Sequence, residues 1–299
     1  MLLKITKTLI LGLLLGSSFS LFAQLPVSGF YAKKNSFTLA PSFSYKTYDQ
    51  FYAGSELQEG NPAGLGEISS SIYSIYAQYG ISDRISATLT LPYIQLVSED
   101  GIPGPVVNDT EVDGFQDLGL YIKGKILEKS FENKSKLTLG SAAGITFPLG
   151  DYEGAGVLSL GNQATTFNGC GIVQYTFHKV FLEAQLGYSI RTNSDFDIPN
   201  AVFYSTKLGY LHKYFYVHSK LEFQGSTSGL DIGTEEFAAA GGALVLPETD
   251  VDYTNLSFNL YVPVYKSTFG VSGSYITTLD GRNFSKEKGF GIGLVYNVK

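Results

Sequence analysis

The chain of 299 residues is rich in aromatic residues and glycine, with 21 Tyr, 21 Phe and 34 Gly, and only 16% of its residues are charged. Its formal net charge of −6 argues against nucleic-acid binding, a role that basic domains perform. A single Cys excludes an internal disulfide, and no Cys/His cluster has metal-ligand spacing, so we expect neither a metal site nor a cofactor.

The N-terminus predicts an export signal. Positively charged residues precede an apolar core at residues 9–15, and Ala23 follows a stretch of small residues, so we expect a signal peptide at 1–23. The apolar core is too short for a membrane anchor, which needs ~20 residues. Leu21 is bulkier than the small residue usual before a cleavage site, so the cut is predicted only to within a few residues. A leader at 24–35 is expected to lie in the periplasm.

From residue 36 onward, apolar residues alternate with small or polar ones, which is the pattern of strands with two unlike faces. In the last segment, Phe290, Ile292 and Leu294 share one face, and the glycines between them share the other. The pattern predicts about twelve strands, which cover residues 37–45, 73–79, 85–93, 118–126, 137–147, 167–177, 180–190, 202–210, 215–223, 256–264, 269–275 and 289–298.

The connections between these strands alternate in length. The short ones cover 80–84, 178–179, 211–213 and 265–267, a moderate one covers 128–135, and the long ones cover 47–67, 97–114, 149–163, 192–200, 226–252 and 279–287. Outer-membrane barrels sort their loops in this way, with the short turns in the periplasm. We therefore expect an all-β fold, a transmembrane antiparallel up-and-down β-barrel of about 12 strands at 36–299 with both termini periplasmic. A soluble, β-rich secreted domain is the alternative.

The same register places charged side chains on the face opposite the apolar one. In lipid, a closed sheet pairs its backbone N–H and C=O groups internally, and its lumen tolerates charge. The candidate pore-lining residues are Lys123, Lys125, Glu183, Arg191, Lys207, His218, Lys220 and Glu222. They either set the selectivity of a pore or form a structural network of ion pairs that fills a narrow lumen.

Catalytic motifs are weak in this sequence. Residues 119–125 imitate a phosphate-binding loop, but Ile126 stands where Ser or Thr is required, and the segment alternates like a strand. His178 and His212 lie in turns and are expected to be solvated. No Gly-x-Ser-x-Gly elbow occurs, so no catalytic residue is assigned and we do not expect an enzyme.

The loop at 226–252 is long and contains two apolar runs, at 237–240 and 243–246. Apolar side chains in such a loop have two uses. Either they fold inward, as a plug or as a contact surface for an apolar substrate, or they extend a strand or pack over the rim of the barrel.

Several segments resemble one known family. They read Tyr-Gly-Ile-Ser-Asp-Arg-Ile at 79–85, Leu-Pro-Tyr at 91–93, Gly-Phe-Gln-Asp-Leu-Gly at 114–119 and Gly-Ile-Thr-Phe-Pro-Leu-Gly-Asp at 144–151. They resemble the bacterial outer-membrane family of proposed transporters of the MetA-type phenol-degradation pathway. The segments depart from its pattern at Gln116, where Gly is usual, and at Leu149, where Thr is usual. The resemblance implies an outer-membrane channel for hydrophobic or aromatic compounds, and it carries over no catalytic or binding residue.

The C-terminal residues Gly293, Tyr296 and Val298 resemble the signal that the barrel-assembly machinery recognises, although the chain ends in Lys299 rather than an aromatic residue. The expected partners are therefore outer-membrane lipid, that machinery and a small apolar solute, in the outer membrane of a Gram-negative bacterium.

Three function classes remain open from the sequence. The first is a passive channel for small, apolar molecules, and the second is a structural or surface-interaction barrel with a filled lumen. The third is an outer-membrane hydrolase of the phospholipase kind, whose activity would depend on His218. The transported substrate, its direction and the openness of the lumen are not encoded in the alternation.

Overall fold

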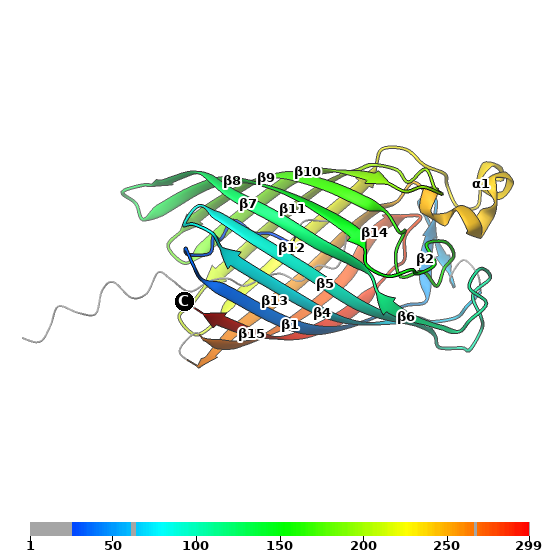
Figure 1. The fold of residues 1–299 in the computed structure, drawn as a ribbon, viewed down its shortest axis with the longest axis horizontal. Coiled ribbons are helices and arrows are strands. Elements are labelled where there is room, and N and C mark those ends of the chain that lie inside the picture. The colour runs from blue at the N-terminus through cyan, green and yellow to red at the C-terminus, as the bar shows by residue number, and fades with distance from the viewer. Residues whose placement is uncertain (1–25, 61–63, 266–267, 299) are drawn as a thin grey trace, which may run out of the picture.

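The computed structural model describes residues 26–60, 64–265 and 268–298. Its main body is a closed antiparallel barrel of twelve strands (Figure 1), in which β1 pairs with both β4 and β15. The strands are β1 (Phe37–Tyr48), β4 (Ile68–Gly80), β5 (Ile85–Ser98), β7 (Asp117–Ser130), β8 (Ser135–Pro148), β9 (Thr165–Phe177), β10 (Val180–Thr192), β11 (Ala201–Leu211), β12 (Tyr216–Ser226), β13 (Asp252–Tyr265), β14 (Phe269–Arg282) and β15 (Lys288–Val298).

Each predicted strand corresponds to one of these twelve, with 215–223 beginning one residue ahead of β12, so the period-two alternation is confirmed as the signal for the barrel. The real strands are longer where the sequence does not alternate. β4 begins at Ile68, ahead of the predicted residue 73, because the serines that follow Ile68 fit either face of a sheet and hide the pattern. The predicted signal peptide lies outside the described residues, as does Lys299.

Three short strands and two helices decorate one end of the barrel. The hairpin of β2 (Gln50–Ala53) and β3 (Glu56–Glu59), the strand β6 (Glu111–Phe115), the helix α1 (Glu235–Ala240) and the 3-10 helix η1 (Gly242–Glu248) all belong to segments predicted as long loops. None of the helices among the described residues is long and apolar enough to cross a membrane.

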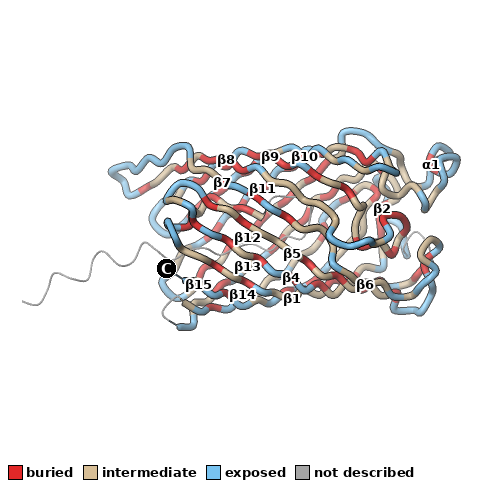
Figure 2. Tube along the Cα trace, viewed as in Figure 1, coloured by how far each residue is buried: buried red, intermediate tan, exposed pale blue. Residues whose placement is uncertain are grey.

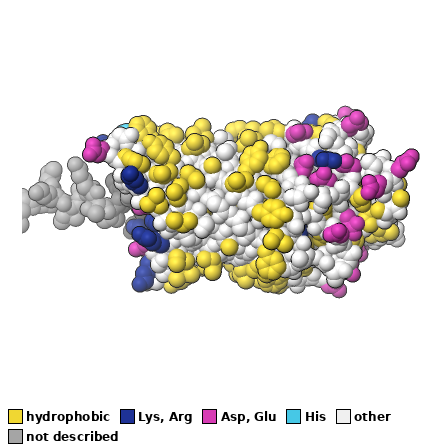
Figure 3. Space-filling view, turned by 90° about the horizontal axis from the view of Figure 1, so that it is seen from above, with side chains coloured by type: hydrophobic (Ala, Val, Ile, Leu, Met, Phe, Trp, Pro, Cys, Tyr) yellow, Lys and Arg dark blue, Asp and Glu magenta, His cyan; other side chains and the backbone are white. Residues whose placement is uncertain are grey.

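The two ends of the barrel differ. We call the end with the tight turns, such as Ser82 to Ile85 and His212 to Phe215, the turn end, and it also holds the start of β1 and the end of β15. The opposite end, which carries β2, β6, α1 and η1, is the loop end (Figure 1). On the face in Figure 3, Lys and Arg gather at the turn end and Asp and Glu at the loop end.

Burial alternates along the strands (Figure 2) because successive side chains point to opposite faces of the wall. Large apolar side chains point outward and are exposed, with Leu186 at 63% and Ile126 at 66%, whereas Lys123 and Glu183 point inward at 0% and 1%. An apolar outer wall around a charged interior is suited to lipid and not to water. Closure also leaves no unpaired edge of the main sheet exposed to the bilayer.

The chain has no Trp, and exposed Tyr and Phe side chains lie near both ends of the outer wall. Those near the turn end include Tyr79, Phe177, Tyr210, Phe269 and Tyr296, and those towards the loop end include Phe167, Tyr188, Tyr204, Tyr275 and Phe290. Aromatic rings at two levels are typical of the interfaces of a bilayer.

Candidate functional site

The N-terminal segment of residues 26–35, here called the strap, lies inside the barrel. The backbone N–H of Gly29 donates to Glu183 Oε2 at 2.8 Å, and Lys123 Nζ donates to the carbonyl oxygens of Ser28 and Phe30 at 2.7 and 2.5 Å. Residues 24–35 are predicted as a periplasmic leader, and the described part of this segment is held by side chains of the lumen. The strap leaves the lumen at the turn end, where Asn35 N–H donates to the carbonyl oxygen of Gly80.

Apolar contacts also hold the strap in place. The ring of Phe30 meets Phe181 edge-on at 5.1 Å between centroids and meets Tyr216 at 6.1 Å. Val27 belongs to a buried cluster with Tyr121, Ala142, Cys170, Ile172 and Phe203. The strap therefore supplies part of a core inside the barrel.

Gly29 sits where no larger residue fits. A Cβ atom at this position would collide with the side chain of Gln174, which is itself 2% exposed. Glycine thus lets the strap backbone approach Gln174 on one side while its N–H reaches Glu183 on the other.

The predicted charged residues form two groups inside the barrel. In the first, Lys207 pairs with Glu183 at 2.9 Å, and Glu183 also accepts from Gln185 at 2.7 Å. In the second, Lys220 pairs with Glu222 on the same strand. Lys207 and Lys220 are therefore compensated by carboxylates, and Lys123 by backbone carbonyls of the strap, as burial in a low-dielectric interior requires.

Lys125, like Arg191 and His218, lies outside these two groups. A register shift follows it in β7, and its ammonium group pairs with Glu128 at 3.1 Å, near the turn end. Its ammonium also lies 5.6 Å from the centroid of the Tyr31 ring, at the mouth where the strap leaves the barrel.

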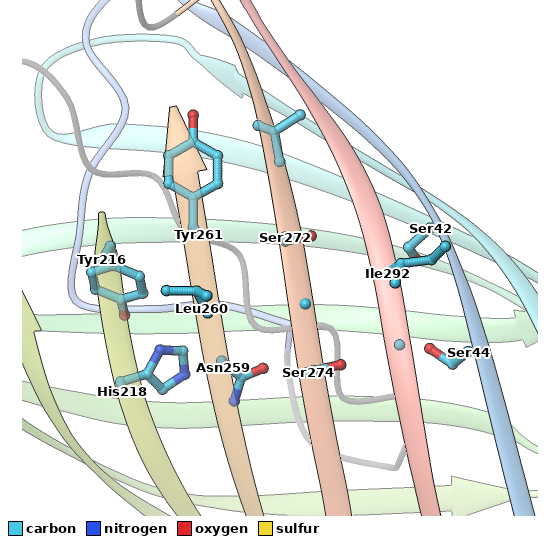
Figure 4. A pocket seen from close by; sticks show the side chains of 13 residues that line it. Ser42, Ser44, Tyr216, His218, Asn259, Leu260, Tyr261, Ser272, Ser274 and Ile292 are labelled. Atoms are coloured by element: carbon cyan, nitrogen blue, oxygen red, sulfur yellow. The ribbon is translucent and has the colours of Figure 1, made fainter. Parts of the chain in front are cut away.

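His218 borders a small cavity of about 30 Å³ (Figure 4). Its other walls include Tyr216, Asn259 and serines of β1 and β14, namely Ser42, Ser44, Ser272 and Ser274. This volume holds about two water molecules. No lipid acyl chain fits beside His218, so the geometry gives no support to the hydrolase hypothesis.

A larger cavity of about 410 Å³, here called the chamber, occupies the loop-end half of the lumen. Pro26 of the strap borders it on one side, and Leu246 and Pro247 of η1 border it on another. Its walls mix aromatic with polar side chains, including Tyr76, Tyr121, Tyr253, Phe284, Gln116, Asp117, Asn162, Asn168, Arg191 and Gln224. Small-molecule sites have volumes from about 300 Å³ upward, so a single-ring compound fits.

The loop at 226–252 combines its two predicted uses, because one part packs at the rim and another part folds inward. Its helix α1 stands at the rim, where Phe237 is buried, whereas Leu246 lines the chamber. The loop is fixed by Asn283, whose side chain donates to the carbonyl oxygens of Leu230 and Asp250 and accepts from Gly54 N–H.

Of the eight predicted site residues, only Arg191 borders the chamber. Sequence reasoning missed the strap because it does not alternate. It missed most chamber residues because alternation identifies the inward face of a strand but not where the lumen stays open. One available signal was Gln116, which departs from the family pattern and lines the chamber. Among the described residues, no group of three or more His, Cys, Asp or Glu is placed to hold a metal ion.

The closed wall, apolar outside and polar inside, defines a porin-like transmembrane β-barrel. Residues 66–244, more than half of the chain, match the family model described as "Putative MetA-pathway of phenol degradation". The chain belongs to that family, which confirms the resemblance seen in the sequence.

Solved structures confirm the fold. The COG4313 outer membrane channel from Pseudomonas putida F1 is similar with a TM-score of 0.67 and 16% identity, over 89% of this chain and 96% of that one. The NanC porin is similar with a TM-score of 0.51 and 11% identity, over 86% of this chain and 98% of that one. No curated protein matches the chain in sequence.

Proposed function

We propose that the protein is an outer-membrane channel that passes small hydrophobic or aromatic molecules without an energy source. The observation that carries this proposal is the chamber, a cavity of about 410 Å³ inside a closed barrel, with Tyr and Phe rings in its wall. The family description refers to phenol degradation, which supports an aromatic solute. Neighbouring folds are channels and porins, which agrees with a role in transport rather than catalysis.

The proposed orientation has the loop end outside the cell and both termini in the periplasm. The tight turns support it, because bacterial outer-membrane barrels have short periplasmic turns and longer outer loops. In this orientation a solute enters the chamber from the side of α1 and η1, and the strap stands between the chamber and the periplasm. The signal peptide and the barrel-assembly machinery remain part of the proposal.

The strap favours a second candidate function, a structural barrel whose lumen is filled. Its contacts with Glu183, Lys123 and Phe181 occupy the turn-end half of the lumen. For transport, the strap must shift or leave a narrow path beside it. We propose that Lys123, Glu183 and Lys207 hold the strap, and that His218, Lys220 and Glu222 line the remaining path.

Uptake into liposomes separates the two functions. The purified chain is reconstituted, and uptake of phenol and benzyl alcohol is compared with that of a sugar of similar size, beside a variant that lacks residues 26–35. The channel proposal predicts preferential uptake of the aromatic compounds and faster uptake without the strap. A folded barrel that passes neither compound with or without the strap contradicts it and supports the filled barrel. A triple variant of His218, Lys220 and Glu222 tests the lining residues in the same assay.

A further inference from the structure

Arg191 is a half-buried guanidinium group at the chamber wall that has no carboxylate partner. Its Nη1 donates to the carbonyl oxygen of Pro199 at 3.2 Å and its Nη2 donates to Gln224 Oε1 at 3.0 Å. None of the ion pairs among the described residues includes it. A guanidinium has five N–H donors, so Arg191 keeps donors for a further acceptor.

The other cations of the lumen are satisfied differently. Lys207 and Lys220 are each paired with a glutamate, and Lys46 pairs with Glu287 at 3.2 Å. Lys123 donates to two strap carbonyls. Arg191 is thus the lumen cation, among the described residues, that borders a sizeable cavity and makes its hydrogen bonds only to neutral groups.

An aromatic surface adjoins the guanidinium. Gln224, which accepts from Arg191, stands opposite Tyr253 in the register of β12 and β13. The Tyr253 ring is stacked with Phe284 at 4.6 Å between centroids, and both rings border the chamber. The wall therefore offers a fork of N–H donors next to a pair of flat rings.

A carboxylate group is the acceptor that matches a guanidinium fork, because two parallel N–H···O bonds form at once. A ring attached to that carboxylate would pack against Tyr253 and Phe284. Asp117 also borders the chamber and receives a hydrogen bond from Tyr152 at 2.6 Å, so a ligand group near it has to be a donor or neutral.

From these contacts we infer that the chamber binds a small aromatic carboxylate, with its carboxylate on Arg191 and its ring beside Tyr253 and Phe284. This inference rests on the proposed function and narrows its solute class. It also implies an effect of salt, because acidic side chains gather at the loop end on the face in Figure 3 and repel an anion before it reaches Arg191. Salt screens exposed charges more strongly than buried ones, so added salt should speed benzoate uptake.

The test compares benzoate with benzyl alcohol, which has the same ring and no charge. Binding to the purified full-length chain in detergent is measured by calorimetry. We expect benzoate to bind at least about tenfold more tightly than benzyl alcohol, the size of a charged hydrogen-bond pair. Arg191→Gln should remove that preference, and Arg191→Lys should retain part of it. Arg84→Gln, a change at an exposed arginine of the turn end, is the matched control and should leave it intact.

Equal binding of the two compounds to the unaltered chain overturns the inference, as does a benzoate preference that survives in Arg191→Gln. If Arg191→Gln does not fold, the comparison on the unaltered chain and on Arg191→Lys still decides the matter. Uptake of benzyl alcohol into liposomes tests the proposed function separately. If benzyl alcohol is not taken up but benzoate binds selectively, transport is contradicted and the binding site stands. If benzyl alcohol is taken up normally but the two compounds bind equally, the binding site is contradicted and transport stands.

Discussion

The backbone N–H of Gly29 donates a hydrogen bond to the carboxylate of Glu183, although 154 positions separate the two residues in the sequence. Glu183 also accepts from Lys207 and from Gln185, so one buried carboxylate joins the strap to two strands of the wall. Whether the strap fills the lumen at the turn end thus depends on contacts between residues that are remote in sequence. Each of these contacts can be removed by a single substitution.

Replacing Glu183 with Gln should release the strap and destabilise the barrel. The change leaves Lys207 without its buried partner, and removal of one partner from such a pair costs about 3–5 kcal/mol. Hydrogen exchange at residues 26–35, read by mass spectrometry, should become faster. Glu128→Gln is the control, because Glu128 belongs to exposed pairs worth about 0–1 kcal/mol. Unchanged protection of the strap in Glu183→Gln would count against its role as an anchor.

Replacing Gly29 with Ala should displace the strap by steric conflict with Gln174. We expect faster exchange in the strap and faster solute uptake, with the barrel strands still protected. Removing the opposing side chain, whose Cβ is among the atoms in conflict, in the double variant Gly29→Ala/Gln174→Gly should restore the strap. Gly171→Ala serves as control, since a Cβ there meets nothing within 4 Å. A strap that stays equally protected in Gly29→Ala refutes the tight fit.

Replacing Leu186 with Lys should destabilise the protein in lipid. Leu186 lies near the middle of β10 and is 63% exposed on the outer wall, where a Lys at the midplane of a bilayer costs about 2–4 kcal/mol. The free energy of unfolding in liposomes measures this cost. Leu149→Lys, at an exposed apolar residue beyond the end of β8, should cost far less. Equal costs at both positions would contradict the assignment of the outer wall to lipid.

The loops at the loop end should open in acid. Two hydrogen bonds from Arg282 hold the pKa of the Asp231 carboxyl below its usual range, whereas burial raises the pKa of Asp250. The contribution of Asp231 is complete above its unfolded pKa, about 4, and is lost as the pH falls further. Asp250 has the opposite effect on the stability of the loop, because its raised pKa lets it take up a proton as the pH falls, which removes a buried charge.

The protection factors of the amides in residues 227–251, which compare observed with intrinsic exchange rates, should therefore stay high from neutral pH down to about 4 and fall below it. Asp231→Asn lacks the depressed carboxyl, so its protection factors should depend much less on pH. An identical acid response in the chain and in Asp231→Asn would show that another group controls the loop.

The barrel was predictable because its strands are regular and local. Lipid outside and charge inside impose a period of two, so the sequence revealed the inward side of Lys123, Glu183 and Lys220. The strap was not predictable, since residues 26–35 have no period and their partners lie in distant strands. The chamber depends on where long loops fold. The departure from the family pattern at Gln116 marks one of its residues, but nothing local to Leu246 encodes that it lines the same cavity as Arg191.

The most direct test of the channel uses the native Cys170. It shares a buried cluster with Val27 of the strap, so Val27→Cys places two thiols in one cluster. Phenol uptake into liposomes is measured with this variant oxidised and then reduced, with Val27→Cys/Cys170→Ser as the control that cannot form the bond. If solute passes through the lumen beside a movable strap, the disulfide should slow uptake, reduction should restore it, and the control should be indifferent. Equal uptake in the cross-linked and reduced forms would contradict the proposed route.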